Sequence, residues 1–224
     1  MSLNILSKLK NKICMPFRYK VLLKEIKVLD NKKILDVGCG DHSPSYTQTN
    51  FPKADYYGVD INEKVIKFFK EKYKFLKVDL ENKSLPFKDN TFDIVLVSHV
   101  LEHLRNVQVV IKECYRILKP GGLIYIEAPS PISIILPSMD GTLNFYDDMS
   151  HIKPFTKTSF KKLLCSHNFK VIKCGTRRDW LWIIFGIPSV IFKNIFWNKP
   201  MYGGYFWDLF GCVVFAIGKK IRNE

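Results

Sequence analysis

The stretch that decides the fold is Lys33-Ile-Leu-Asp-Val-Gly-Cys-Gly40, a short apolar run that closes on two glycines. A run of this length with branched side chains is typical of a buried strand. The glycines end the strand and allow the backbone to approach a ligand closely. A Gly-x-Gly pair alone is weak evidence for a binding loop, because many such pairs are ordinary turns. Motifs elsewhere in the chain are therefore needed to show whether this loop binds a ligand.

Strand and helix signals alternate after this stretch. Helical spacing predicts a helix over 107–118, and Lys119-Pro-Gly-Gly122 then breaks it. Asn62 and Thr158 are suited to cap two other helices, the second running to Asn168. This alternation predicts an α/β fold, Rossmann-like and doubly wound, with a mostly parallel sheet and helices on both faces. Further strands are expected over 56–60, 75–79, 92–97, 123–128, 169–174 and 212–217.

Composition sets wider limits on the protein. The chain has 224 residues, 47% of them hydrophobic, which suits one domain with a real core. Its six cysteines form no Cys-x-x-Cys pair, and lysines interrupt every early apolar run, so a cytoplasmic protein with reduced thiols is expected. The formal net charge of +14 favours an anionic partner, although a Lys-rich and Ile-rich composition would produce the same charge without one.

Two segments depart from the alternating pattern. Residues 1–31 form a basic amphipathic lead-in, and residues 32–224 are expected to form a single domain. Within that domain, residues 180–211 hold all four tryptophans and fit neither a helical nor a strand period, which indicates an aromatic-rich insertion. The uncharged run 180–192 is too short to span a bilayer. A lid, a dimer contact and peripheral docking on an anionic membrane surface all remain open.

Asp60 strengthens the interpretation of the glycine loop. It ends the second predicted strand, about twenty residues after the loop, where a carboxylate can accept both hydroxyls of a ribose. A nicotinamide cofactor is disfavoured, because Ser43 stands at the third glycine of Gly-x-Gly-x-x-Gly and Asp41 would repel a pyrophosphate. A cofactor with a ribose and a positive charge, but no phosphate, fits better.

Four motifs follow one another at spacings that resemble those of class I S-adenosylmethionine-dependent methyltransferases. They are Ile34–Gly40, Gly58-Val-Asp60, the segment Asp79…Leu85-Pro-Phe87…Phe92-Asp93, and Arg116-Ile-Leu-Lys-Pro-Gly-Gly122. The resemblance covers about residues 32–175 and implies S-adenosyl-L-methionine as the cofactor. It also implies a seven-stranded sheet whose last strand is antiparallel.

The resemblance implies roles for residues at both ends of the cofactor. At the methionine end, Gly38 and Gly40 would pack on the amino-carboxypropyl arm, Asp36 would order the loop and the amino group, and Ser98 would line the site.

At the adenosine end, Asp60 would bind the ribose, with Ile61 beside it. Asp79 would accept the adenine amino group, and the backbone of Leu80 would lie beside the ring.

A second segment, Tyr146-Asp-Asp-Met-Ser-His-Ile-Lys-Pro-Phe-Thr156, resembles methyltransferases of bacterial cell-surface glycan pathways. His151 is therefore a candidate general base, oriented by Asp147 or Asp148, with His103 as the second choice. Histidine suits proton removal near neutral pH. The alternative for His151 is a structural role, as a helix cap or as the partner of a backbone carbonyl.

His99-Val-Leu-Glu-His103 matches the zinc motif His-x-x-Glu-His, but no other peptidase feature accompanies it. No metal is predicted, although Glu102 and His103 leave a divalent ion open as an alternative.

The resulting prediction is methyl transfer to a hydroxyl of a small-molecule, sugar or lipid-linked glycan acceptor. A nucleic-acid methyltransferase is disfavoured, because Ser98-His-Val-Leu101 replaces the Asn/Asp-Pro-Pro-Tyr of base-modifying enzymes. A non-catalytic cofactor-binding scaffold is the other alternative. Neither the acceptor nor the oligomeric state follows from the sequence.

Overall fold

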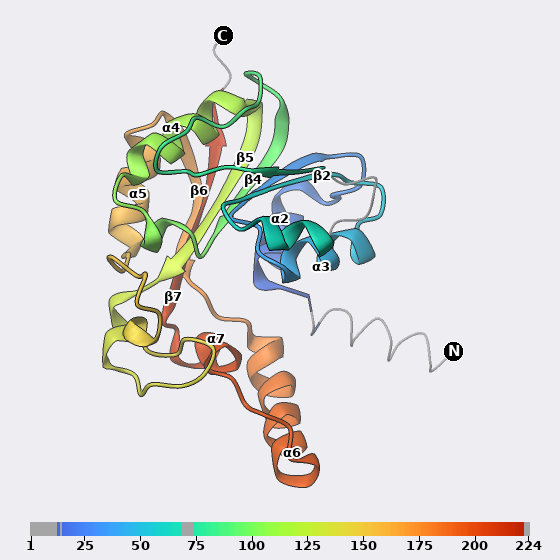
Figure 1. Ribbon diagram of the computed structural model, residues 1–224, viewed down its shortest axis with the longest axis vertical. Coiled ribbons are helices and arrows are strands. Elements are labelled where there is room, and N and C mark those ends of the chain that lie inside the picture. Colours follow the sequence, from blue (N-terminus) through green and yellow to red (C-terminus); the bar gives the residue numbers. More distant parts are fainter. Residues whose placement is uncertain (1–12, 14, 69–73, 222–224) are drawn as a thin grey trace.

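The computed structural model describes residues 13, 15–68 and 74–221 (Figure 1). Its described strands form one seven-stranded sheet in the order β3-β2-β1-β4-β5-β7-β6. The strands are β1 (Lys33–Val37), β2 (Asp55–Asp60), β3 (Lys74–Lys77), β4 (Phe92–Ser98), β5 (Leu118–Pro129), β6 (Phe169–Thr176) and β7 (Val213–Lys220).

The pairing of these strands confirms the predicted fold class. β1 pairs in parallel with β2 on one side and with β4 on the other. β7, the last strand, runs antiparallel to both β5 and β6. Strand order reverses between β1 and β4, and ligands of open α/β sheets bind beyond the carboxyl ends of the strands at such a point. The fold therefore directs attention to the segments that follow Val37 and Ser98.

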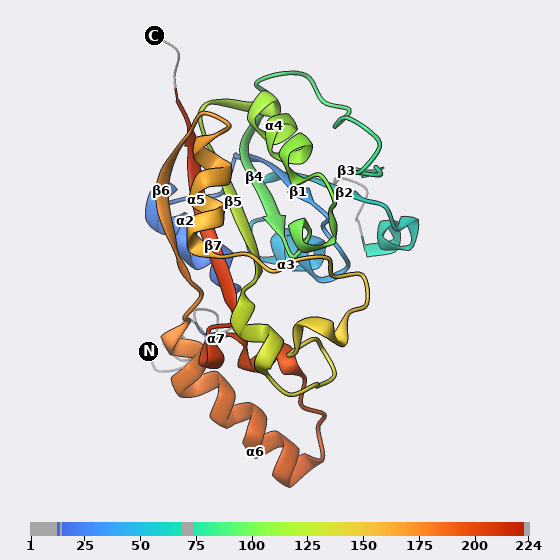
Figure 2. The same cartoon turned by 90° about the vertical axis from the view of Figure 1, so that its left-hand side faces the viewer.

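Helices cover both faces of the sheet, as predicted (Figure 2). On one face, α2 (Phe17–Ile26) buries Tyr19 and Leu22 in a cluster that contains sheet residues such as Ile94. On the other face, the larger cluster joins α4 (Val107–Ile117) and α5 (Lys157–Cys165) to the sheet. α3 (His42–Asn50) follows the glycine loop. Helix α2 lies within the 1–31 lead-in, of which residues 1–12 and 14 lie outside the described residues.

Local signals placed some element ends correctly and others wrongly. Asn62 accepts the backbone N–H of Lys64 at 3.0 Å, but the turn that it starts, η1 (Glu63–Phe68), is a 3₁₀ helix. The cap predicted at Thr158 was wrong, because Thr156 caps α5 through a reciprocal pair of hydrogen bonds with Ser159. Asn168 adopts the left-handed conformation expected of it, with φ of 62°.

The glycines at Lys119-Pro-Gly-Gly122, predicted to end a helix, lie within the first part of the long strand β5. The loop after β5 contains two short 3₁₀ turns, η3 (Pro131–Ile135) and η4 (Phe145–Asp147).

Residues 180–211, which we call the aromatic arm, form a π-helical turn η5 (Trp182–Gly186), α6 (Ile187–Trp197), η6 (Gly203–Phe206) and α7 (Trp207–Phe210). Both views show α6 projecting away from the sheet (Figures 1 and 2). None of the described helices combines the length and the apolar character needed to cross a membrane.

Candidate functional site

The glycine loop after β1 is packed at one glycine and open at the other. Both Gly38 and Gly40 have left-handed backbone conformations, with φ of 65° and 55°. A Cβ atom at Gly38 would lie 2.2 Å from Cγ2 of Val100, whereas a Cβ at Gly40 would meet no atom of the described residues within 4 Å. The loop therefore lies against the segment that follows β4, and it leaves free space beside Gly40.

Asp60, the last residue of β2, lies against this loop. Its Oδ2 accepts the backbone N–H of Gly40 at 3.0 Å, and its Oδ1 accepts that of Asn62 at 2.9 Å. Ile61 follows it with a largely exposed side chain. The Asp60 carboxylate thus connects the end of β2 to the loop that follows β1.

Asp36 is buried beneath the loop. Its Oδ2 accepts hydrogen bonds from the hydroxyls of Ser43 and Tyr56, the latter at 2.8 Å, and Arg18 donates to Ser43 at 2.9 Å. Burial raises the pKa of the Asp36 carboxyl group above its usual value, despite the nearby Arg18 charge. The Asp36 side chain thus ties the end of β1 to the start of α3, and Ser43, at the position of the missing third glycine, is its partner.

Asp79 and Leu80 follow β3 at the same edge of the sheet. Asp79 accepts hydrogen bonds from the side chain of Asn82 at 2.8 Å and from the backbone N–H of Glu81 at 3.0 Å. The Asn82 hydrogen bond holds the pKa of Asp79 below its usual value. The backbone N–H of Val78 donates to the carbonyl of Asp60 at 3.0 Å, which connects this segment to the end of β2.

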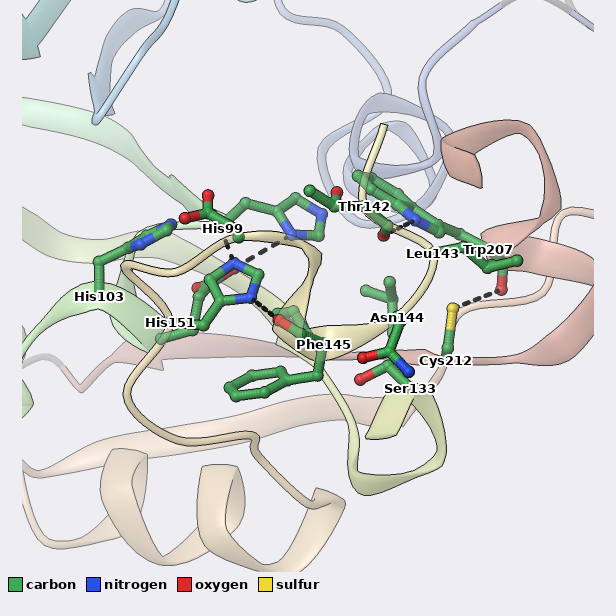
Figure 3. Close-up of a pocket in the computed structure, with 14 residues that line it drawn as sticks. His99, His103, Ser133, Thr142, Leu143, Asn144, Phe145, His151, Trp207 and Cys212 are labelled. Carbon is green, nitrogen blue, oxygen red and sulfur yellow. Dashed lines mark hydrogen bonds and ion pairs between the residues drawn. The ribbon is translucent and has the colours of Figure 1, made fainter. Parts of the chain in front are cut away.

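A cavity of about 110 Å³ opens beyond the carboxyl ends of β4 and β5 (Figure 3). Figure 3 shows His103 and His151 together at one end of it and Trp207 and Cys212 at the other. The loop after β5, which contains η3 and η4, and the aromatic arm supply much of the lining. Because Val100 touches the glycine loop and Glu102 lines the cavity, the two regions are neighbours.

Several buried polar atoms near these strand ends have no hydrogen-bond partner among the described residues. They are Oγ of Ser98, Nε2 of His99, Oε2 of Glu102 and Oγ of Ser130. Buried polar groups in folded proteins nearly always find a partner, so such a cluster is a signature of a ligand site. Ser98, predicted to line the methionine end of a cofactor, belongs to it.

The structure brings together the two histidines named as candidate bases. The ring centroids of His103 and His151 are 4.8 Å apart. Nδ1 of His151 lies 2.6 Å from the carbonyl oxygen of Phe145, and its Nε2 lies 3.9 Å from Oδ2 of Asp148. The orientation of the His151 ring is therefore set mainly by a backbone carbonyl, with Asp148 nearby.

Asp147, the other acid considered for orienting His151, has a different role. Its Oδ2 accepts the backbone N–H groups of Asn144 at 2.8 Å and of Met139 at 3.1 Å. It therefore stabilises the loop that covers the cavity.

His99 does not form a helical zinc motif with His103. Its backbone is left-handed, with φ of 55°, and Nδ1 lies 3.2 Å from Oε1 of Glu102. Its ring packs on Trp207 with centroids 4.6 Å apart. Residues 101–103 form only a 3₁₀ turn, η2 (Leu101–His103), so the motif lacks the helix that its peptidase interpretation requires.

Sequence reasoning missed a buried charged network behind His99. Glu127, within β5, accepts the hydroxyl of Tyr125 at 2.6 Å and lies 3.8 Å from Nη1 of Arg177. Arg177 also pairs with Asp208 of α7 at 3.0 Å. A glutamate inside the otherwise apolar run 123–128 was the available signal, because a buried charge needs a partner. The network links the sheet to the aromatic arm.

A family model described as a methyltransferase domain matches residues 35–126. A demethylmenaquinone methyltransferase of Anoxybacillus flavithermus is 33% identical over 152 residues, 64% of this chain and 62% of that protein. The chain thus spans less than two thirds of that relative. An uncharacterized protein of Methanocaldococcus jannaschii is 33% identical over 157 residues, 67% of each chain.

Two solved structures with a similar fold are also described as S-adenosylmethionine-dependent methyltransferases. An S-adenosylmethionine-dependent methyltransferase of Archaeoglobus fulgidus is 26% identical, with a TM-score of 0.62 over 94% of this chain and 97% of that one. Another, from Mesorhizobium loti, is 15% identical with a TM-score of 0.66 over 93% of this chain and 100% of that one, which shows the shared fold. From the glycine loop, the strand order and these matches, the chain belongs to the class I S-adenosylmethionine-dependent methyltransferases, whose cofactor is S-adenosylmethionine.

Proposed function

We propose that this protein transfers a methyl group to an oxygen-bearing small or lipid-linked acceptor that binds in the histidine-lined cavity. The observation that carries the proposal is the free space at the Cβ position of Gly40, next to a cavity edged by unpartnered buried polar atoms. The first feature leaves room for a ligand against bare backbone, and the second provides groups to bind one. Residues 32–224 would act as one methyltransferase domain.

The residues around the glycine loop fit S-adenosylmethionine. Gly38 and Gly40 would contact its amino-carboxypropyl arm, and Oγ of Ser98 has an unused hydrogen-bonding capacity at the methionine end. Asp36 would act indirectly, since its buried carboxylate orders the loop through Ser43.

At the adenosine end, Asp60 and the neighbouring Ile61 would hold the ribose. Asp79 and the Leu80 backbone would hold the adenine. The backbone hydrogen bond between Val78 and Asp60 supports this division, because it keeps the ends of β2 and β3 adjacent.

The cofactor supplies a methyl group already activated on a sulfonium, so the protein mainly has to position the acceptor. We assign the acceptor oxygen to the end of the cavity that holds His103 and His151. Nε2 of His151 would take the proton from this oxygen, with His103 as the second candidate and Asp148 as a nearby carboxylate. The side chain of His151 is 7% exposed, which limits competition from water.

Two classes of acceptor are compatible with the site. One would be methylated on an oxygen atom and the other on a carbon atom. A sugar or phenolic hydroxyl would be methylated on oxygen, as the glycan-pathway resemblance indicates. The demethylmenaquinone methyltransferases among the relatives favour a second candidate, methylation of a quinone-type ring on carbon. Both reactions benefit from removing a proton from an acceptor oxygen, so the histidine pair serves either one. A nucleic-acid acceptor and a non-catalytic scaffold are less well supported, because the cavity is small and both glycines are present.

The aromatic arm suits an amphiphilic acceptor. Ile195, Phe196 and Trp197 at the far end of α6 are 69%, 64% and 62% exposed. No acidic residue lies between Trp180 and Trp207, whereas Lys193 and Lys199 are present. Exposed aromatic rings next to lysines fit the headgroup region of an anionic bilayer. We propose that the arm docks on such a surface, and the rival interpretation is contact with a second copy of this chain.

A two-stage experiment tests the function. Isothermal titration with S-adenosylhomocysteine should show one site per chain, and absence of binding would rule out the enzyme. Transfer of a labelled methyl group would then be compared for reduced demethylmenaquinone and for phenolic, sugar and lipid-linked hydroxyl acceptors. The position of the label in the product separates methylation on carbon from methylation on oxygen. Transfer to RNA but to none of these acceptors would overturn the proposal.

A further inference from the structure

Glu102, His103 and His151 bring three metal-binding groups to one point of the cavity. One carboxylate oxygen and one nitrogen of each ring all lie within 4.8 Å of one another. The side chain of Glu102 is 0% exposed, yet its Oε2 has no hydrogen-bond partner. A buried carboxylate oxygen without a partner is costly, so this one is placed to bind something.

The hydrogen bonds around His151 fix which of its nitrogens is free. Nδ1 lies 2.6 Å from the carbonyl oxygen of Phe145. A carbonyl can only accept, so Nδ1 carries the proton and donates it. In the neutral ring Nε2 then presents a lone pair. Figure 3 shows His151 beside His103 with the Phe145 backbone on its other side.

A short chain of hydrogen bonds fixes His103 in the same way. The backbone N–H of Ser150 and its hydroxyl both donate to Oδ1 of Asp148, at 2.9 and 2.5 Å. The Asp148 oxygen accepts the backbone N–H of Ser150, so the Ser150 hydroxyl also donates to it. The single Ser150 proton is thereby used, and its oxygen accepts from Nδ1 of His103 at 2.8 Å. Nε2 of His103 is left with its lone pair.

We propose that Glu102, His103 and His151 form a binding site for one divalent transition cation, of the class of Zn²⁺, Co²⁺ or Mn²⁺. Two imidazole nitrogens and one carboxylate suit these ions better than Mg²⁺ or Ca²⁺, which prefer oxygen ligands. Metal-binding histidines usually donate their other ring nitrogen to a carbonyl or a carboxylate. Phe145 and the Ser150–Asp148 pair provide such partners here.

The site gives the cation a role in the proposed methyl transfer, on which this part of the inference rests. Three protein ligands leave at least one coordination position open toward the cavity. An acceptor oxygen in that position would be held and its anionic form stabilised by the cation. With the cation bound, Nε2 of His151 would be a ligand rather than the base. The cation would stabilise the acceptor oxygen anion, and the proton of the acceptor hydroxyl would be released to solvent.

Metal binding can be measured without any activity assay. The protein is treated with a chelator, dialysed, and titrated calorimetrically with Co²⁺, Zn²⁺, Mn²⁺ and Mg²⁺, and Co²⁺ binding is followed by its visible absorption. We expect one tight site for Co²⁺ and Zn²⁺ and much weaker binding of Mg²⁺. His103→Ala and Glu102→Gln should each weaken Co²⁺ binding at least tenfold. His167→Ala is the matched control, because this histidine lies just after the end of α5 and its Nδ1 bonds to the Leu163 carbonyl.

Binding of S-adenosylhomocysteine to each variant shows whether it is folded. Should Glu102→Gln fail to fold, His103→Ala and His151→Ala still test the site, since both residues are less buried than Glu102. Co²⁺ binding unchanged in His103→Ala and His151→Ala, or no Co²⁺ binding by a protein that binds S-adenosylhomocysteine, would overturn the metal site alone. Loss of S-adenosylhomocysteine binding by the unaltered chain would instead overturn the proposed function. Full methyl transfer in chelator-treated protein would remove the catalytic role of the cation.

Discussion

Asp60 at the end of β2 accepts the backbone N–H of Gly40 at 3.0 Å, across the boundary between two neighbouring strands. The same carboxylate accepts the N–H of Asn62 at 2.9 Å. One side chain thus shapes the glycine loop and the start of the next turn, and a carboxylate still has lone pairs available for further donors. We therefore expect a substitution of Asp60 to change both the shape of the glycine loop and the affinity for the cofactor.

We expect Asp60→Ala to weaken binding of S-adenosylhomocysteine by about 1.5–3 kcal/mol, the typical contribution of hydrogen bonds to a charged group. Isothermal titration measures this loss, and thermal unfolding shows whether the variant is folded. Asp55→Ala is the matched control, because Asp55 is exposed at the opposite end of β2. Equal affinity in Asp60→Ala and the unaltered chain would mean that the ribose assignment is wrong.

Gly40→Ala tests the free space beside the loop. A Cβ there meets nothing within 4 Å, so the substitution should cost only the strain of a left-handed alanine, about 1–2 kcal/mol of stability. The methyl group would occupy the space assigned to the cofactor, and S-adenosylhomocysteine binding should fall at least tenfold. Asn90→Ala introduces similar strain, at φ of 54°, before the start of β4 and should bind normally. Normal binding by Gly40→Ala would place the cofactor elsewhere.

The fold could be predicted because its signals are local. Strand β1 was found at the predicted residues 33–37, since a short apolar run closed by glycines has few other interpretations. The cap of α5 was misplaced because Thr156 and Thr158 look alike in isolation, and only the return bond from Ser159 distinguishes them. The aromatic arm had no period to detect, because a π-helical turn and short helices follow one another there.

The sequence could place only those site residues that lie at or next to the ends of predicted strands. Gly38, Gly40 and Asp60 stand directly at strand ends, so topology places them together. The pairing of Glu127 with Arg177 joins residues that are far apart in sequence and requires β7 to lie between β5 and β6. The contact of His99 with Trp207 likewise depends on where the arm folds back.

Arg177→Met should lower the free energy of unfolding by about 3–5 kcal/mol, because it leaves the buried carboxylates of Glu127 and Asp208 without their shared partner. Denaturant unfolding at neutral pH measures the loss. Lys170→Ala, an exposed position on β6, should change stability by less than about 0.5 kcal/mol. A loss of under about 1 kcal/mol in Arg177→Met would show that the network is not stabilising.

The difference in stability between the unaltered chain and Arg177→Met should also depend on pH. Burial alone would raise the pKa of Glu127, but the charges of Arg177 and His99 hold it below its usual value of 4.5. A depressed pKa stabilises the folded state above the unfolded value, and that stability is lost as the pH falls through the folded value. The stability difference between the unaltered chain and Arg177→Met should therefore shrink below about pH 4.5. A difference that stays constant down to pH 3 would exclude Glu127 as its source.

His151→Ala should lower turnover by about 10²–10⁴ with little change in S-adenosylhomocysteine affinity, whether the imidazole acts as the base or as a metal ligand. Addition of Co²⁺ should not restore the variant. His167→Ala is again the control and should turn over normally. Unchanged turnover in His151→Ala would leave this residue with the structural role of donating to the Phe145 carbonyl.

The aromatic arm predicts binding to anionic vesicles, which flotation on a density gradient measures. Phe196→Ala with Trp197→Ala removes two exposed rings, each contributing about 1.5–3 kcal/mol when buried, so vesicle binding should fall more than tenfold. Ile135→Ala with Met149→Ala removes two exposed apolar side chains outside the arm and should not affect it. Raising the salt concentration should weaken binding, because Lys193 and Lys199 interact with the lipid charge. If the unaltered chain fails to float at low salt and sediments as a dimer that the Phe196/Trp197 variant cannot form, the arm is a contact between copies of this chain.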